Sequence, residues 1–212
     1  MTNRPVDAGG VPDALLCDLD GVLRHWDPAL MPRLEREYGL PPGSFARAAF
    51  HPDRLLPAVT GAVTDEEWRE TVVEHLAPAC GARMRARELV AAWTATPATV
   101  DAEVLTMLTA VRRRVPVVLV TNATTRLDSD LAALGLTRAV DAVVNSAREG
   151  TAKPDQGIFR IAAERAGVPT GRCLFVDDTP GHVTAARELG MTALHHRENA
   201  ALRRALEPLL RP

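Results

Sequence analysis

The sequence of 212 residues contains no apolar stretch that approaches the roughly 20 residues needed for a membrane-spanning helix. Residues 1–13 also lack the apolar segment of a secretory signal, so we expect them to form a frayed N-terminus of a cytoplasmic protein. A net charge of -2 shows no excess of basic residues. Neither a membrane nor a nucleic acid is therefore an expected partner.

Cysteine and lysine are scarce as well. The three cysteines, Cys17, Cys80 and Cys173, show no metal-type pair spacing, and their odd number argues against a disulfide framework. Because free cysteine is commonly buried, we predict reduced thiols in the core. Of the 25 lysines and arginines, Lys153 is the single lysine. This skew is typical of coding bias, but it makes the one ammonium group conspicuous.

The second half of the sequence alternates between helical and strand-like segments, which is the signature of βαβ units and a parallel sheet. Strands are predicted at residues 116–120, 142–144, 173–176 and 192–194, and helices at 100–113, 127–134, 156–166, 182–189 and 199–210. The fold class is therefore α/β with a Rossmann-like parallel sheet.

Residues 24–97 show a helical pattern without a convincing strand. Thr64 and Glu67 have the spacing of a capping box, and apolar residues then recur at helical spacing. Helices are predicted at residues 28–38, 45–50, 65–77 and 83–93, with Pro57 and Pro78 as breaks. We expect a helical cap over residues 24–97, inserted in a core of residues 1–23 and 98–212.

An apolar run at residues 15–23 stops at two carboxylates, Asp18 and Asp20. It has the pattern of a buried parallel strand, and ligands of open α/β sheets bind beyond the carboxyl ends of the strands. Two alternatives remain for this stretch. The acidic end could cap the next element, or it could belong to a calcium loop, although such a loop needs a further oxygen ligand before its glycine.

Other strand ends and loops carry polar groups too: Thr121, Asn122, Lys153, Asp177 and Asp178. Taken in order, the segments DLDGV, VTN, AKPDQGIF and FVDDTPGHV resemble the four motifs of the haloacid dehalogenase (HAD) superfamily. The resemblance covers nearly the whole chain from Ala14 on. It implies a Rossmann-like core with a helical cap directly after the first motif.

Electrostatics leads to the same chemistry. Asp18, Asp20, Asp177 and Asp178 would repel one another and a phosphate unless a hard cation is bound, and Mg²⁺ is the natural choice. With such a cation, Asp18 can act as a carboxylate nucleophile that forms an aspartyl-phosphate. Asp20 can then act as general acid for the leaving oxygen and as base for the hydrolytic water.

The resemblance implies further roles. Asp18, the backbone carbonyl of Asp20 and Asp178 would hold Mg²⁺, while Asp177 would act through a water or through Lys153. The Thr121 hydroxyl and the Asn122 backbone N–H would bind phosphoryl oxygens, although a threonine at a strand end can also simply cap the following helix. Lys153 would offset charge between nucleophile and phosphate, unless it is a solvated residue ahead of a helix.

Together these features predict a phosphatase that hydrolyses small phosphate monoesters, with a small phosphorylated metabolite as partner, as a monomer or a homodimer. The alternatives are a phosphomutase of the β-phosphoglucomutase type, a 2-haloacid dehalogenase, or a non-catalytic metal-binding module. Dehalogenases of the family need no metal and lack an acid at the position of Asp20, so the sequence is more similar to the phosphatase and phosphomutase branches.

Candidates for substrate recognition are weaker, since each could equally be a solvated or packing side chain. Arg24, His25 and Trp26 follow the first motif near the expected entrance, and Arg47 or His51 could reach in from the cap. Trp68 and Trp93 are expected as anchors of the cap core. His182 is expected beside the site at a helix N-terminus, whereas His195 and His196 have no motif role.

Overall fold

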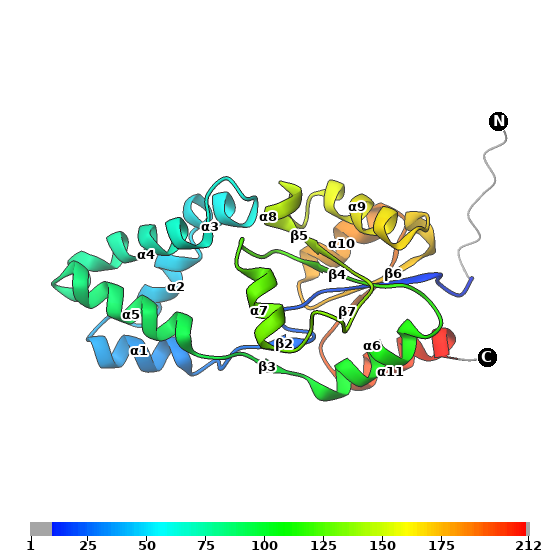
Figure 1. The fold of residues 1–212 in the computed structure, drawn as a ribbon, viewed down its shortest axis with the longest axis horizontal. Coiled ribbons are helices and arrows are strands. Elements are labelled where there is room, and N and C mark those ends of the chain that lie inside the picture. The colour runs from blue at the N-terminus through cyan, green and yellow to red at the C-terminus, as the bar shows by residue number, and fades with distance from the viewer. Residues whose placement is uncertain (1–9, 211–212) are drawn as a thin grey trace.

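The computed structural model describes residues 10–210 of the chain. Five parallel strands form one sheet in the order β5-β4-β1-β6-β7, with β1 at its centre (Figure 1). The strands are β1 (Ala14–Cys17), β4 (Val117–Thr121), β5 (Ala142–Asn145), β6 (Cys173–Asp177) and β7 (Thr192–His195). The predicted α/β class and its parallel sheet are therefore confirmed.

Residues of β1 alternate between the two faces of this sheet. Leu15 and Cys17 belong to one apolar cluster, and Ala14 and Leu16 belong to a second cluster on the other face. The first cluster is covered by α6 (Ala102–Arg112), α7 (Leu127–Ala133) and α11 (Asn199–Leu210), and the second by α9 (Gln156–Ala166) and α10 (Pro180–Glu188) (Figure 1). Because both faces are buried, the strands have nearly continuous apolar sequences.

Five helices lie together at one end of the molecule, beside the sheet (Figure 1). They are α1 (Leu30–Tyr38), α2 (Ser44–Ala49), α3 (Pro52–Val59), α4 (Asp65–Cys80) and α5 (Arg83–Ala95). Their apolar side chains, among them Phe45 and Trp68, form a third cluster. Since this cluster is separate from the two clusters around the sheet, we propose residues 24–97 as a cap domain and the remainder as the core.

A short antiparallel pair of strands links the two parts. β2 (Arg24–His25) pairs with β3 (Thr99–Val100). The expectation that residues 24–97 contain no strand is therefore wrong at the first two positions. The helix expected from residue 100 begins only at Ala102, because Val100 is in β3 and the Asp101 side chain accepts hydrogen bonds from the backbone N–H groups of residues 103 and 104.

Proline misleads the prediction in the cap. Pro57 and Pro78 lie inside α3 and α4 rather than between helices, so α4 continues to Cys80. The pattern also fails to predict α3, which begins at Pro52, in the first turn where proline needs no hydrogen-bonding N–H. Two further short elements, α8 (Ser146–Glu149) and a 3-10 turn at Thr170–Arg172, are not predicted, and α10 begins at Pro180 rather than at His182.

The chain is anchored where it enters the sheet. Arg172 donates to both carboxylate oxygens of Asp13, each at 2.7 Å, and Asp13 N donates to the Arg172 carbonyl. The expectation of a frayed N-terminus is thus wrong at Asp13, and residues 1–9 lie outside the described residues. None of the helices in residues 10–210 is both long and apolar enough to cross a membrane. The three cysteines are free and buried, as predicted.

The predicted capping box is confirmed and supports a stability prediction. Thr64 Oγ1 accepts from Glu67 N at 3.2 Å, and Glu67 Oε2 accepts from Thr64 N at 2.7 Å. Thr64→Ala should lower the free energy of unfolding by about 1 kcal/mol, because it leaves a helix-terminal N–H without its acceptor. Thr71→Ala in the same helix is the control, since alanine is the better helix former there. Equal stabilities of the two variants in urea unfolding would contradict a role for the cap.

Candidate active site

Three neighbouring strands end at one edge of the sheet, and their polar residues meet there. Asp18 directly follows β1, Asp177 ends β6 and Thr121 ends β4. Because β1 lies between β4 and β6, the parallel pairing brings these ends together. The exposed fractions are 5% for Asp18, 0% for Asp177 and 1% for Thr121. All three residues are buried at this edge, and Thr121 is not a helix cap because the N-cap of α7 is Arg126.

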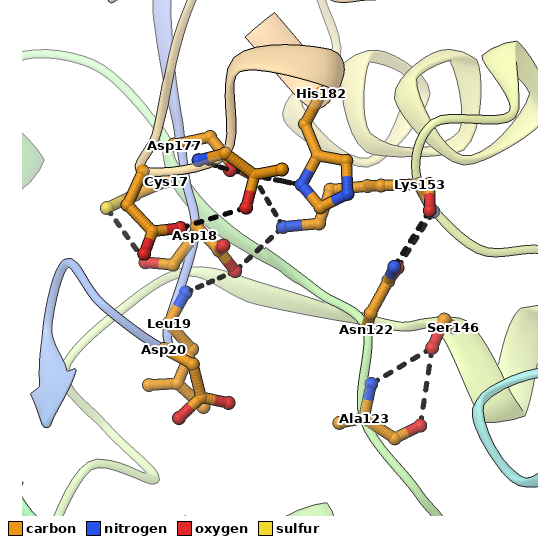
Figure 2. Close-up of polar contacts among 12 residues, drawn as sticks. Cys17, Asp18, Leu19, Asp20, Asn122, Ala123, Ser146, Lys153, Asp177 and His182 are labelled. Atoms are coloured by element: carbon orange, nitrogen blue, oxygen red, sulfur yellow. Dashed lines mark hydrogen bonds and ion pairs between the residues drawn. The ribbon is translucent and has the colours of Figure 1, made fainter. Parts of the chain in front are cut away.

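Lys153 reaches this group from the loop between α8 and α9 (Figure 2). Its Nζ lies 2.7 Å from Asp18 Oδ1 and 2.7 Å from Asp177 Oδ2, and the residue is 4% exposed. Asp18 Oδ1 also accepts from the backbone N–H of Leu19 at 2.7 Å. The single lysine of the sequence is therefore a buried bridge between two carboxylates and not a solvated residue.

Asn122 holds the lysine loop in place, a contact that the sequence does not reveal. Its Nδ2 donates to the Lys153 carbonyl at 2.8 Å, and its Oδ1 accepts from Lys153 N at 2.8 Å (Figure 2). A side-chain amide has the donor and acceptor needed to pair with one peptide unit in this way. Since the two residues are far apart in sequence, only their placement after adjacent strands could have suggested the contact.

Asp18, Lys153, Asp177 and His182 form a cluster of charged and titratable side chains in which one lysine contacts two carboxylates. Burial raises the pKa of Asp18, the negative charge of Asp177 raises it further, and Lys153 opposes the shift. Burial also acts to raise the pKa of Asp177, but the hydrogen bonds from His182 and Lys153 hold it well below its ordinary value. Despite burial, the two carboxylates raise the pKa of Lys153. One ammonium therefore serves two carboxylates, and Asp18 is the one left short of positive charge.

Asp20 lies two residues after Asp18 in the loop that follows β1, but its carboxylate points away from Asp18, Lys153 and Asp177 (Figure 2). Arg24 donates from Nε to Oδ1 and from Nη2 to Oδ2, both at 2.7 Å, and Trp26 Nε1 donates to Oδ1 at 2.8 Å. Arg24 also lies 3.4 Å from Asp130 and stacks at 5.0 Å over the Trp26 ring. Arg24 and Trp26, which are predicted near the entrance, thus both use their side-chain N–H groups to bind Asp20.

Asp178 and the loop after Asp18 approach each other closely. Gly21 has φ +78°, and a Cβ at this position would lie 2.0 Å from Asp178 Oδ2. His182, in the first turn of α10, places Nδ1 3.0 Å from Asp177 Oδ1. Ligand atoms of Asp18, Asp177 and His182 all lie within 4.8 Å of one another. This edge of the sheet is therefore rich in ligand atoms, most of them carboxylate oxygens.

The remaining candidates lie outside this cluster. His25 Nε2 is 3.8 Å from Asp101 Oδ2. Arg47 donates to the Pro42 carbonyl and to Ser44 Oγ, each at 3.3 Å, so its guanidinium is used within the cap. His51 caps α3. His195 Nε2 contacts the carbonyl oxygen of Asp178 at 2.8 Å, a contact without a motif signal in the sequence.

A cavity of about 250 Å³ adjoins the cluster on the side of the cap. Asp20, Asn122 and Thr124 contribute to it from the core, and Trp68 and Trp93 contribute from the cap helices. Trp68 belongs to the cap core as expected, yet it also faces this space. The cavity thus lies between cap residues and the loops that follow β1 and β4, and Asp20 and Asn122 are the cavity residues next in sequence to the buried cluster.

A family model described as a hydrolase, haloacid dehalogenase-like hydrolase, matches residues 12–190. Phosphatase MT3486 of Mycobacterium tuberculosis (strain CDC 1551 / Oshkosh) is 46% identical over 54 residues, which are 26% of this chain and 25% of the relative. The match therefore spans about a quarter of the length of that curated relative.

Solved structures show the same fold. A HAD family enzyme, bt-2542, from Bacteroides thetaiotaomicron in complex with magnesium and inorganic phosphate has a TM-score of 0.70 at 22% identity, covering 89% of this chain and 95% of that one. A HAD-like family hydrolase from Porphyromonas gingivalis has a TM-score of 0.70 at 23% identity, with coverages of 93% and 99%. L-2-haloacid dehalogenase from Xanthobacter autotrophicus has a TM-score of 0.62 at 20% identity, with coverages of 92% and 82%.

The matched residues 12–190 include all of the strand ends and loops that build the buried cluster. The solved structures share less than 25% sequence identity with this chain, so they show only that the fold is the same. Membership of the family is shown by the family model, which matches the sequence itself. The protein therefore belongs to the haloacid dehalogenase-like hydrolases.

Proposed function

We propose that the protein is a Mg²⁺-dependent phosphatase that hydrolyses small phosphate monoesters through an aspartyl-phosphate on Asp18. The observation that carries the proposal is the buried bridge of Lys153 between Asp18 and Asp177, in which Asp18 lacks full charge compensation. Such a carboxylate at a strand end suits a nucleophile beside a cationic phosphate site. The phosphatase from Mycobacterium tuberculosis and the magnesium and phosphate complex of the Bacteroides enzyme support it.

The residues present fit Mg²⁺. Asp18 and Asp178 offer hard carboxylate oxygens, and the absence of a side chain at Gly21 leaves room for Asp178 beside the Asp18 loop. In the proposal these two carboxylates and the Asp20 carbonyl hold the ion, and Asp177 acts through Lys153. When bound, the ion supplies the positive charge that this cluster lacks and that a phosphoryl group requires.

The proposed reaction has two steps. Asp18 Oδ forms a bond to phosphorus as the bond to the ester oxygen breaks, and Asp20 gives a proton to the departing alcohol. A water then attacks the phosphorus and loses a proton to Asp20, which releases phosphate and restores Asp18. Lys153, the Thr121 hydroxyl and the Asn122 backbone N–H bind the phosphoryl oxygens. Asp20 must leave Arg24 and Trp26 to take part.

The presence of an acid at Asp20 and of the pair Asp177 and Asp178 favours phosphoryl transfer over dehalogenation. The likeness to the haloacid dehalogenase is a likeness of fold at 20% identity. Among residues 10–210 no contact favours a phosphomutase over a phosphatase, and hydrolysis is the function that we propose.

Phosphate release from an aryl phosphate should require Mg²⁺ and should stop in excess chelator, because the acidic cluster otherwise repels the substrate.

Asp18→Asn should lower kcat by about 10⁴-fold or more, since an amide is a poor nucleophile. Asp53→Asn, at an exposed carboxylate in the cap, is the matched control. Full turnover in chelator, or near wild-type turnover of Asp18→Asn, would overturn the proposed mechanism.

Gly21→Ala should raise the Mg²⁺ concentration needed for half-maximal activity by about ten-fold or more, because the new Cβ displaces the carboxylate of Asp178. Gly190→Ala is the control. Gly190 has a similar φ of +80° but open space around a Cβ, so this variant carries the same backbone strain without the displacement. If Gly21→Ala needs the same Mg²⁺ concentration as the wild type, the assignment of Asp178 as a metal ligand is wrong.

Lys153→Arg should lower kcat/KM by about 10²- to 10³-fold, nearly as far as Lys153→Ala. A planar guanidinium cannot take the place of a compact ammonium that contacts Asp18 and Asp177 at 2.7 Å in a buried space. Thermal melts of both variants check folding. Wild-type kcat/KM in the arginine variant would show that only the charge, and not the shape of the ammonium, matters.

A further inference from the structure

The cavity beside the cluster has an apolar wall that comes from every cap helix. The helices and their ends contribute Met31, Phe50, Leu55, Val59, Trp68 and Trp93. Trp68 Nε1 donates to the Ala49 carbonyl at 3.1 Å, so the polar atom of this indole is already satisfied inside the cap. What Trp68 offers to the cavity is hydrocarbon surface.

The charged residues of the cavity lining are paired with one another or with their neighbours. Both cations among the described lining residues are engaged: Arg24 binds Asp20, and Arg126 Nε lies 2.9 Å from Asp130. Asp27 lies 3.3 Å from Arg33 and accepts from a backbone N–H. The cap side of the cavity therefore offers little to a sugar, a nucleotide or a carboxylate, whose polar groups would be buried against hydrocarbon.

Two large aromatic side chains at the cavity remain partly open to solvent. Trp26 is 45% exposed and Phe50 is 42% exposed, and both line the cavity. The Phe50 ring packs edge-on against Trp93, at 6.2 Å between centroids, so it belongs to an ordered aromatic wall. Burying apolar surface of this kind against an apolar ligand lowers the free energy, because the surface is removed from water.

Two residues of the proposed mechanism, Asp20 and Asn122, line the cavity. Asp20 is the residue that protonates the departing alcohol in the proposed mechanism, so the alcohol must lie within reach of Asp20. At about 250 Å³ the space is at the small end of ligand sites. A compact group is therefore expected to occupy it.

We propose that this cavity binds the leaving group of the substrate and that the leaving group is a compact apolar alcohol, aliphatic or aromatic. The inference rests on the proposed phosphatase function and specifies its substrate class. The wall formed by Leu55, Trp68 and Trp93 selects the ester by burying its hydrocarbon, while the strand ends hold the phosphoryl group.

The test is a series of primary alkyl phosphates, from ethyl through propyl and butyl to 3-methylbutyl phosphate. These alcohols are similar in acidity, so differences in kcat/KM report on binding of the alkyl group. Each added CH₂ should raise kcat/KM by about four-fold until the cavity is full. Propyl phosphate should also be a better substrate than glycerol 3-phosphate, which has the same carbon chain with two hydroxyls. A flat series, or a preference for the glycerol ester, overturns the inference.

Two neighbouring leucines of α3 provide matched variants. Leu55 lines the cavity, whereas Leu56 is 57% exposed and is not among its lining residues. Leu55→Asn should flatten the dependence of kcat/KM on chain length, and Leu56→Asn should leave it unchanged. For each variant, kcat/KM is expressed relative to methyl phosphate, which barely enters the cavity, so that only the dependence on chain length is compared. Equal slopes in the two variants would overturn the assignment of the cavity.

An aryl phosphate with Mg²⁺ separates failure of the inference from failure of the proposed function. If the aryl ester is hydrolysed but kcat/KM does not depend on the length of the alkyl chain, the proposed phosphatase function stands and the proposal of an apolar leaving group is wrong. Absence of Mg²⁺-dependent phosphate release from both the aryl and the alkyl esters overturns the proposed function, and the inference falls with it.

Discussion

The site depends on one ammonium group that lies between two buried carboxylates. Removing ions from water is costly, and the attraction between Lys153 and the carboxylates of Asp18 and Asp177 offsets that cost only when the geometry is held closely. The structure holds it in three ways. β1 and β6 pair directly, which fixes the spacing of the carboxylates, and Asn122 binds the backbone of Lys153. His182 adds a further contact to Asp177.

The rest of the core serves this rigidity. A strand in a sheet covered by helices on both faces cannot slip in register without losing the packing of its side chains against both layers and drawing a polar strand end toward the core. The ends of these strands are therefore fixed relative to one another, and so are the charges placed there. Two carboxylates share one ammonium at these strand ends, and burial disfavours the charged form of Asp18. In the proposed function, a bound cation supplies the further positive charge that stabilises both carboxylates.

Most of this arrangement could be predicted from the sequence because long apolar strands and strand-end polar residues leave local signals. Asp18, Thr121 and Asp177 all follow such signals, and Lys153 is conspicuous as the single lysine ahead of a predicted helix. The failures have local reasons too. β2 and β3 are two residues each, too short for periodicity, and Pro57 and Pro78 are tolerated in helices where packing against the cap core outweighs a lost hydrogen bond. The side chain of Asn122 and the glycine at Gly21 act through contacts that are distant in sequence.

The position of Asp20 depends on the link between the two parts of the chain. Arg24 is a residue of β2, and Trp26 follows this strand, so the donors that hold the Asp20 carboxylate belong to the segment that joins sheet and cap. The Arg24 backbone is tied to the loop as well, through Gly21 N and the Leu19 carbonyl. The Asp20 carboxylate accepts three side-chain hydrogen bonds from this segment. Any shift of β2 against this loop would change the donors around Asp20. In the proposed mechanism, proton transfer by Asp20 is therefore coupled to the placement of the cap that carries the apolar wall.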